Sequence, residues 1–265
     1  MHVSRLFIHP IKSCASLAVE HMEVRARGPH ADRRWMLVDE SGRFVTGRKL
    51  APMVRLRAAP IPAGLQLGWD AETMRIAEPG GEHGRLQVTV WKSEVDAALA
   101  DPAVSSWISE RLGAPLRLVF MDARSERWAS PERAGPGQPV SFADGYPYLM
   151  FGESALDAMN ARIDPPVPAE AFRPNIVVAG NAAHAEDGWQ RLRIGSISFR
   201  QTKPCVRCVF TTVDPQRGER RPDGEPLKSL RGYRLAEDGV LFGVNLVAES
   251  SGIIRLGDPV EVLDQ

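Results

Sequence analysis

Short runs of β-forming residues, separated by turn signals, dominate roughly the first ninety residues of the chain. Apolar and β-branched residues gather there in segments too short for helices, with Pro and Gly clusters between them. Ser41–Gly42 stands between two such segments in the manner of a hairpin loop. The strands predicted in this part are Val3–Ile8, Leu17–Val24, Trp35–Val38, Phe44–Thr46, Val54–Ala58, Leu65–Leu67 and Leu86–Val90.

Two helices are predicted further along the chain. Asp101 is expected to cap the first helix, with Pro102 at its first position and Gly113 just past its end. The apolar residues of this helix recur at helical spacing, as Val104, Trp107, Ile108 and Leu112. The second helix is expected to begin at Ser154, and its apolar side is formed by Leu156, Met159 and Ile163.

The rest of the chain again favours strands, without regular βαβ alternation and without an internal repeat. Arg124–Pro139 is polar and rich in Pro and Gly, so it is predicted as a loop. The further strands are Leu116–Phe120, Ile176–Ala179, Leu192–Ile194, Ile197–Gln201, Val206–Val213, Leu241–Val247 and Val260–Leu263. We therefore expect a mainly β, barrel-like protein with a few covering helices (α+β), in two lobes at residues 1–95 and 96–265.

The formal net charge is zero, because 33 basic residues balance 33 acidic ones. This excludes a chain that coats nucleic acid or an anionic membrane through its overall charge. The charge is uneven, since Val24–Arg57 carries nine basic and three acidic residues and Ser196–Arg234 carries nine and four. No apolar run reaches the ~18–20 residues of a membrane span. The N-terminal apolar stretch is too short for a signal peptide, so we expect a cytoplasmic protein.

The chain has three cysteines, and Cys205 and Cys208 stand in a Cys-x-x-Cys spacing. A structural zinc site normally needs two such pairs, and a thioredoxin-like redox pair should precede a helix, whereas this pair runs into β-forming residues. Two ordinary buried cysteines are a third hypothesis. The fourth is a thiolate ligand to a soft metal centre, favoured by the nearby Lys203 and Arg207. The spacing alone leaves all four open.

The segment around this pair resembles the signature of the MOSC family of molybdenum-cofactor proteins; it reads Lys203-Pro204-Cys205-Val206-Arg207-Cys208-Val209-Phe210-Thr211-Thr212-Val213-Asp214-Pro215. The likeness is greatest to the mitochondrial amidoxime reducing component and its bacterial relatives. Five further segments occur in the family's order, namely Pro10–Cys14, Asp32–Trp35, Phe172–Ile176, Glu186–Trp189 and Gly257–Val260. The resemblance therefore spans nearly the whole chain and implies a MOSC N-terminal β-barrel domain over residues 1–95 and a MOSC domain over residues 96–265.

The resemblance also implies a set of site residues. Molybdenum would be held by a pterin dithiolene and by one protein ligand, Cys208, with Cys205 as its neighbour. Cofactor binding is implied for Lys12, Ser13, Arg33, Gly145, Tyr146, Arg173, Asn175, Val206 and Arg207. Asp144 matches a loop beside the metal and is a candidate catalytic proton donor. A buried anionic cofactor needs positive charge and directed donors of this kind.

The implied function is that of a molybdenum-cofactor oxidoreductase, which reduces small N-hydroxylated compounds such as amidoximes and hydroxylamines and does not need pyridoxal phosphate. The cysteine pattern of a plant-type ferredoxin is absent. Electrons are therefore expected from a separate protein, such as a flavin reductase, a ferredoxin or a small cytochrome. Two alternatives remain: a carrier or sulfuration protein that holds the cofactor without turnover, and a protein that acts on another oxidised sulfur or nitrogen compound.

Overall fold

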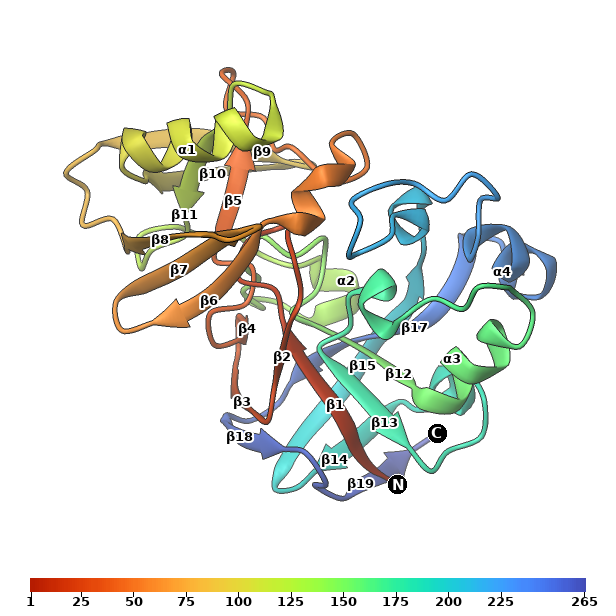
Figure 1. Ribbon diagram of the computed structural model, residues 1–265. Coiled ribbons are helices and arrows are strands. Elements are labelled where there is room, and N and C mark those ends of the chain that lie inside the picture. The colour runs from red at the N-terminus through yellow and green to blue at the C-terminus, as the bar shows by residue number, and fades with distance from the viewer.

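The computed structural model describes residues 1–265 and divides the strands among four sheets (Figure 1). The largest has nine strands in the order β19-β14-β15-β17-β12-β13-β1-β2, with β16 beside β17. Its pairs are antiparallel except that β12 and β13 run parallel. Its strands are β1 (His2–Ile8), β2 (Leu17–Val19), β12 (Tyr148–Gly152), β13 (Ile176–Ala179), β14 (Arg191–Ile194), β15 (Ile197–Val206), β16 (Leu235–Ala236), β17 (Gly239–Ala248) and β19 (Val260–Asp264).

Three smaller sheets complete the fold. The four-stranded sheet β5-β11-β10-β9 and the three-stranded sheet β6-β7-β8 form the upper lobe in Figure 1, where helix α1 covers them. The remaining sheet, β18-β3-β4, joins the beginning of the chain to its end. These elements are β3 (His21–Arg25), β4 (Gly28–Pro29), β5 (Trp35–Val38), β6 (Arg57–Ile61), β7 (Gly64–Trp69), β8 (Glu72–Ala77), β9 (Arg85–Val90), β10 (Ser93–Leu99), β11 (Arg117–Phe120), β18 (Gly252–Arg255) and α1 (Pro102–Leu112).

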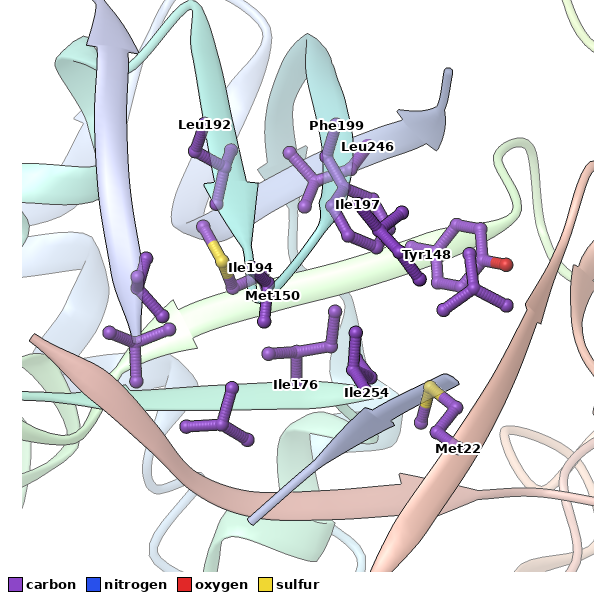
Figure 2. Close-up of a cluster of buried hydrophobic side chains, with 14 of the residues drawn as sticks. Met22, Tyr148, Met150, Ile176, Leu192, Ile194, Ile197, Phe199, Leu246 and Ile254 are labelled. Atoms are coloured by element: carbon purple, nitrogen blue, oxygen red, sulfur yellow. The ribbon is translucent and has the colours of Figure 1, made fainter. Parts of the chain in front are cut away.

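Separate apolar cores hold the lobes together. Alternate side chains of the large sheet point inward and gather around Met150, Ile176 and Phe199 (Figure 2). On another face, helices α3 (Glu153–Asn160) and α4 (Leu227–Arg234) cover a cluster in which the Phe172 and Phe242 rings stack with their centroids 4.1 Å apart. The remaining helical segments are α2 (Pro131–Ala134), η1 (Ala51–Arg55), η2 (Ala169–Phe172), η3 (Ala185–Gly188) and η4 (Val209–Thr212). No helix has the length and apolar character needed to cross a membrane.

The predicted architecture, mainly β with a few covering helices, is confirmed. Helix α1 begins and ends as expected, because the Asp101 carboxylate accepts a hydrogen bond from Ala103 N at 2.8 Å and Gly113 takes a left-handed conformation. The second predicted helix begins at Glu153 rather than Ser154, and it ends before Ile163. The capping residues therefore predicted the bounds of α1 more accurately than the apolar pattern predicted those of α3.

The predicted strand Val206–Val213 is wrong. Strand β15 ends at Val206, and the next residues form the 3₁₀-helix η4. The Thr211 hydroxyl donates to Cys208 O at 3.0 Å, and the Thr212 hydroxyl donates to Val209 O at 2.8 Å. These local side-chain-to-backbone bonds offer the chain a turn instead of a sheet partner, which outweighs the β propensity of Val and Thr.

Four other predicted segments differ in detail. The strand Leu17–Val24 is interrupted at Glu20, and η1 occupies the first part of Val54–Ala58 because Pro52 favours the start of a helix. The hairpin around Ser41–Gly42 is confirmed by the antiparallel bridge between Val38 and Phe44, but Phe44–Thr46 is no longer strand beyond that bridge. The predicted loop Arg124–Pro139 holds the short helix α2.

Candidate functional site

The sheet register brings the chain's N-terminal segment beside residues 173–175. In the antiparallel pair of β1 and β13, Leu6 faces Ile176, and Phe7 N donates to Asn175 O at 2.9 Å. The chain then leaves β1 and passes β5, where Lys12 N donates to Trp35 O at 2.8 Å. Backbone pairing alone therefore brings the segments that carry Lys12 and Arg173 together at one edge of the large sheet.

A cavity of about 470 Å³ opens at this edge, between the two lobes. Its volume lies in the range typical of small-molecule sites, ~300–1,000 Å³. Every residue predicted for the site lines this one cavity: Lys12, Ser13, Arg33, Asp144, Gly145, Tyr146, Arg173, Asn175, Val206, Arg207 and Cys208. The structure therefore brings the predicted residues together, whereas their individual roles stay predictions.

Several lining residues were missed by sequence reasoning. The upper lobe contributes Arg48 and Trp91, and the large sheet contributes Asn245. Lys203 also lines the cavity, and the sequence had marked it only as a basic neighbour of the cysteine pair. Arg48 lies in the basic segment Val24–Arg57, and this clustering of charge was the only feature of the sequence that could have pointed to it as a site residue. Trp91 stands at the turn between β9 and β10, directly after the predicted strand Leu86–Val90, and no sequence signal marked it for the site.

Three predicted site residues in the cavity wall have left-handed backbones. The φ angles are 65° at Ser13, 48° at Arg33 and 57° at Arg173. Non-glycine residues rarely adopt this region, and each instance costs of order ~1–3 kcal/mol. Such strain persists where surrounding structure holds it, and it concentrates at functional sites. Its occurrence at three predicted ligand-binding positions marks the cavity as a built site.

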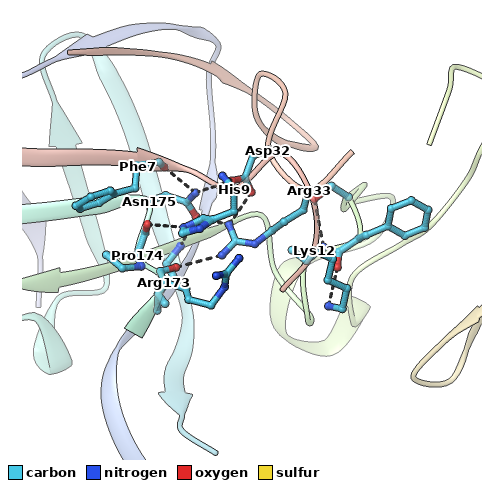
Figure 3. Close-up of polar contacts among 12 residues, drawn as sticks. Phe7, His9, Lys12, Asp32, Arg33, Arg173, Pro174 and Asn175 are labelled. Atoms are coloured by element: carbon cyan, nitrogen blue, oxygen red, sulfur yellow. Dashed lines mark hydrogen bonds and ion pairs between the residues drawn. The ribbon is translucent and has the colours of Figure 1, made fainter. Parts of the chain in front are cut away.

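A buried carboxylate connects these segments (Figure 3). Asp32 is fully buried; its Oδ1 accepts from His9 N at 2.7 Å and from Asn175 Nδ2 at 3.2 Å, and its Oδ2 accepts from Arg33 Nη1 at 2.6 Å. Arg33 also donates to Arg173 O at 3.1 Å. Asp32 therefore fixes Arg33 between the N-terminal segment and the Arg173–Asn175 segment.

Asn175 has no free hydrogen-bonding capacity. Its Oδ1 accepts from Arg33 Nη1 at 3.3 Å and from Leu149 N at 3.2 Å. Its Nδ2 donates to Phe7 O and to Asp32 Oδ1, each at 3.2 Å. Both donors and the acceptor of the amide are thus used within the protein. This geometry favours a positioning role for Asn175 over direct contact with a ligand.

Lys12 and Asp144 form the central ion pair of the cavity. Lys12 is buried, and its Nζ donates to Asp144 Oδ1 at 2.5 Å and to Phe142 O at 2.7 Å. Burial lowers the pKa of Lys12 to about 8, although Asp144 acts in the opposite direction. Desolvation raises the pKa of Asp144, but Lys12 and a hydrogen bond from Trp91 outweigh it and hold that pKa well below its usual range. Asp144 is therefore a carboxylate at neutral pH, and Lys12 holds the proton.

Two guanidinium groups lack partners for buried atoms. Arg173 donates through Nη1 to Cys14 O at 2.6 Å, but its buried Nη2 has no partner. Arg207 donates to Phe172 O and to Cys205 Sγ, and its buried Nε has no partner. Burial, with the nearby Arg33 charge, lowers the pKa of Arg173. Since a guanidinium stays protonated in proteins, this crowding of positive charge favours a bound anion.

The three cysteines have different surroundings. Cys14 is fully buried, and burial raises the pKa of its thiol to about 12, so it is an inert core residue. Cys205 is half-buried and accepts a hydrogen bond from Arg207 Nη1 at 3.0 Å. Cys208 is exposed to the cavity at the start of η4. Arg207 therefore hydrogen-bonds to Cys205, whereas the sequence analysis expected its charge to favour a thiolate at either cysteine.

The protein's side chains do not form a metal site by themselves, since no three His, Cys, Asp or Glu side chains gather. A metal at Cys208 would therefore take its other ligands from a bound molecule. The unpartnered nitrogens of Arg173 and Arg207, the cationic walls and the single exposed thiol fit a pterin cofactor that carries both a phosphate and a dithiolene.

Gly47 sets the distance between the upper lobe and the cysteine segment. A Cβ at this position would lie 2.2 Å from Cε2 of the Phe210 ring, which follows Cys208 in η4. We expect Gly47→Ala to push Phe210 away and to lower the free energy of unfolding by about 1–3 kcal/mol, as overpacking does. Urea unfolding of the purified variant measures this. Gly188→Ala is the control, because a Cβ there meets nothing within 4 Å; equal losses in both variants would contradict the clash.

The lowered pKa of Lys12 predicts a pH dependence of anion binding. The charged form of Lys12 is present below pH 8 and is lost as the pH rises through that value, so affinity for an anion falls. We expect the cofactor-free protein to bind phenyl phosphate up to about tenfold more weakly per pH unit above 8, measured by titration calorimetry. A phosphate monoester is already a dianion there, because its second pKa is near ~6. Lys12→Arg should flatten the profile; an unchanged decline in that variant would assign the titration to another group.

The fold and cavity together define a mainly β protein with a cationic cavity beside an exposed cysteine, and comparisons with known proteins identify its family. The family model described as the MOSC N-terminal beta barrel domain matches residues 1–115, and the MOSC domain matches residues 137–261. Our own boundary between residues 95 and 96 stays a prediction. This chain belongs to the family of MOSC-domain molybdenum-cofactor proteins that includes the mitochondrial amidoxime-reducing components.

Similarity to the amidoxime-reducing components extends over nearly the whole chain. Component 1 of Mus musculus is 32% identical over 284 residues, which cover 99% of this chain and 82% of that protein. Component 1 of Homo sapiens is 30% identical over 290 residues, covering 99% and 83%. Component 2 of Bos taurus is 29% identical over 287 residues, covering 97% and 82%. The names of these relatives describe reductases of amidoximes.

Proposed function

We propose that this protein is a molybdenum-cofactor-dependent reductase of small N-hydroxylated compounds. The observation that carries the proposal is the single exposed thiol of Cys208, which faces a cavity lined by six cationic side chains and one carboxylate. Such a cavity suits an anionic cofactor next to a soft sulfur ligand. The relatives' names, which describe amidoxime reduction, support the substrate class.

The chain's residues would divide the work of holding the cofactor. Cys208 would be the one protein ligand to the metal, and Lys12, Ser13 and Arg173 would bind the phosphate of the pterin. Arg33 would add positive charge while Asn175 keeps it in place. The walls beside the metal would be Gly145, Tyr146, Val206 and Arg207. The bound cofactor would supply a two-electron redox centre, which protein side chains lack.

The overall reaction fixes what the chain must provide. An amidoxime that loses its N–O oxygen takes up two electrons and two protons, and it yields an amidine and water. Asp144 is a carboxylate at neutral pH, so its proposed part is to relay a proton to the departing oxygen rather than to store one. Lys12 Nζ, hydrogen-bonded to Asp144 Oδ1, holds the proton that can follow. The electrons would come from a separate protein, such as a flavin reductase, a ferredoxin or a small cytochrome.

Two measurements on the purified protein test the proposal. The protein should be made in a host that synthesises the cofactor, and molybdenum and pterin should then be present at about one per chain. Reduced viologen should drive the conversion of benzamidoxime to benzamidine. Lack of molybdenum in such a preparation would overturn the proposal, and so would cofactor-loaded protein that reduces no N-hydroxylated compound.

A cofactor carrier that does not turn over is the alternative. It is favoured by the second thiol, because Cys205 lines the same cavity and accepts a hydrogen bond from Arg207, a setting that suits a sulfur-carrying cysteine. A carrier would bind the cofactor, reduce no benzamidoxime, and pass the cofactor to a cofactor-free acceptor enzyme. A persulfide on Cys205 or Cys208 in mass spectrometry would support this alternative.

A further inference from the structure

The cavity has more positive charge than the proposed cofactor contacts use. Two of its six cationic side chains are paired with carboxylates, Lys12 with Asp144 and Arg33 with Asp32. Arg48, Arg173, Lys203 and Arg207 have no carboxylate partner. Arg173 and Arg207 are anchored to backbone or sulfur acceptors next to the proposed cofactor site. The side chains of Arg48 and Lys203 have no such anchor, although the Arg48 charge contributes to the low pKa of Asp144.

Arg48 is held at the cavity by its backbone neighbours. Gly47 packs directly against the Phe210 ring, which places the segment beside the cysteine signature. The Arg48 guanidinium lies over the Trp91 ring, 4.3 Å from its centroid, and it makes no hydrogen bond or ion pair. A guanidinium that stacks on a ring in this way keeps its N–H groups free at its edge, where they suit a planar or tetrahedral oxyanion.

Trp91, on which this guanidinium lies, makes two further side-chain contacts. Its ring packs against Phe44 at a centroid distance of 5.1 Å, and its Nε1 donates to Asp144 Oδ1 at 3.2 Å. The Trp91 backbone has a φ of 57°, a strained conformation at the turn between β9 and β10. The turn therefore presents Trp91, and Arg48 upon it, next to the carboxylate proposed to relay the proton. A group bound by Arg48 would belong to a molecule whose reacting end lies near Asp144.

We propose that Arg48, stacked on Trp91, binds a carboxylate or phosphate group on the substrate, so that the enzyme prefers anionic N-hydroxylated compounds. This inference rests on the proposed reductase function and adds the charge of its substrate. The upper lobe then determines specificity, and the large sheet supplies the thiol and the cofactor contacts. A hydrogen-bonded charge pair of this kind favours the anionic substrate by about 10- to 100-fold.

The test compares 4-carboxybenzamidoxime with benzamidoxime, which differ by one anionic group. The molybdenum-loaded protein should show a kcat/KM at least about tenfold higher for the carboxylated compound. Arg48→Gln should remove this preference by raising KM for that compound, with the neutral compound little changed, and Arg48→Lys should restore part of it. Calorimetric binding of 4-carboxybenzamidoxime should weaken in parallel. Arg43→Gln, an exposed arginine outside the cavity, is the matched control.

Three other outcomes overturn the inference in distinguishable ways, and a fourth narrows it to phosphate. An equal fall in kcat/KM for both compounds in Arg48→Gln would show that Arg48 does not discriminate between charged and neutral substrates. Loss of molybdenum or pterin from Arg48→Gln would assign Arg48 to the cofactor's phosphate instead. A gain for a phosphorylated but not for a carboxylated substrate would identify phosphate as the group bound. If loaded wild-type protein reduces neither compound, the proposed function itself fails, and this inference fails with it.

Discussion

Cys208→Ser should lose molybdenum on purification and should reduce benzamidoxime at least about 100-fold more slowly than the wild-type protein. The reason is that Cys208 is the exposed thiol of the cavity, and no three metal-binding side chains gather to replace it. Removal of a neighbour of a metal ligand already costs ~10–100-fold in affinity or activity, so removal of the ligand itself should cost more. Metal analysis and the viologen-driven assay on the same preparation measure both effects.

Cys205→Ser is the matched control for this result, because it makes the same Sγ-to-Oγ change in the other cysteine of the cavity wall, three residues before Cys208. Cys205 has Arg207 as its partner, and serine can accept the same hydrogen bond from Arg207 Nη1. We expect this variant to keep its molybdenum and most of its activity. The reverse pattern, with metal lost from Cys205→Ser and kept in Cys208→Ser, would transfer the ligand role to Cys205.

Eleven residues of the cavity could be predicted, because each lies in a short segment that matches a motif of the family. Pro10–Cys14 and Phe172–Ile176 lie far apart in sequence, yet the antiparallel register of β1 and β13 brings them side by side. The family resemblance implied that the two segments meet at one site. The hydrophobic pattern alone predicted strands β1 and β13 but not their pairing. Motifs therefore located the site, and the sheet register explains why the motifs meet.

The properties of the site groups could not be predicted in the same way. The sequence favoured Asp144 as a proton donor, but a buried ammonium from a residue 132 positions away keeps it ionised. Asn175 lies in a motif that the family uses for cofactor binding, yet all hydrogen-bonding groups of its side-chain amide are paired with protein atoms. Arg48 and Trp91 meet only because two separate turns of the upper lobe converge. Charge and hydrogen-bond saturation depend on these long-range contacts, which no local pattern contains.

Helix η4 shows the same limit for secondary structure. Val209–Thr212 is made of residues with high β propensity, and a strand was the natural prediction. Two threonine hydroxyls satisfy carbonyls within the segment, so the chain turns away from β17 after Val206. The turn has a consequence for the site, because Cys208, Phe210 and Thr211 line the cavity from this turn.

Asp32→Asn should lower the free energy of unfolding by about 3–5 kcal/mol, the cost of breaking a buried ion pair from one side. Asp32 is fully buried, and the Arg33 side chain paired with it is only 12% exposed. An amide at this position has one oxygen for His9 N, Asn175 Nδ2 and Arg33 Nη1, and its NH₂ would oppose one of these donors. Urea unfolding of the cofactor-free protein measures the loss.

Asp70→Asn is the matched control, because it removes the same charge from an ion pair of the same length in solvent. Arg55 Nη2 lies 2.6 Å from Asp70 Oδ1, but the Asp70 side chain is 66% exposed, and such pairs contribute ~0–1 kcal/mol. Equal losses in the two variants would show that the Asp32 network adds nothing beyond an exposed pair. A large loss confined to Asp32→Asn, with weaker phosphate monoester binding, would show that the buried carboxylate holds Arg33 and Arg173 in place for the anion.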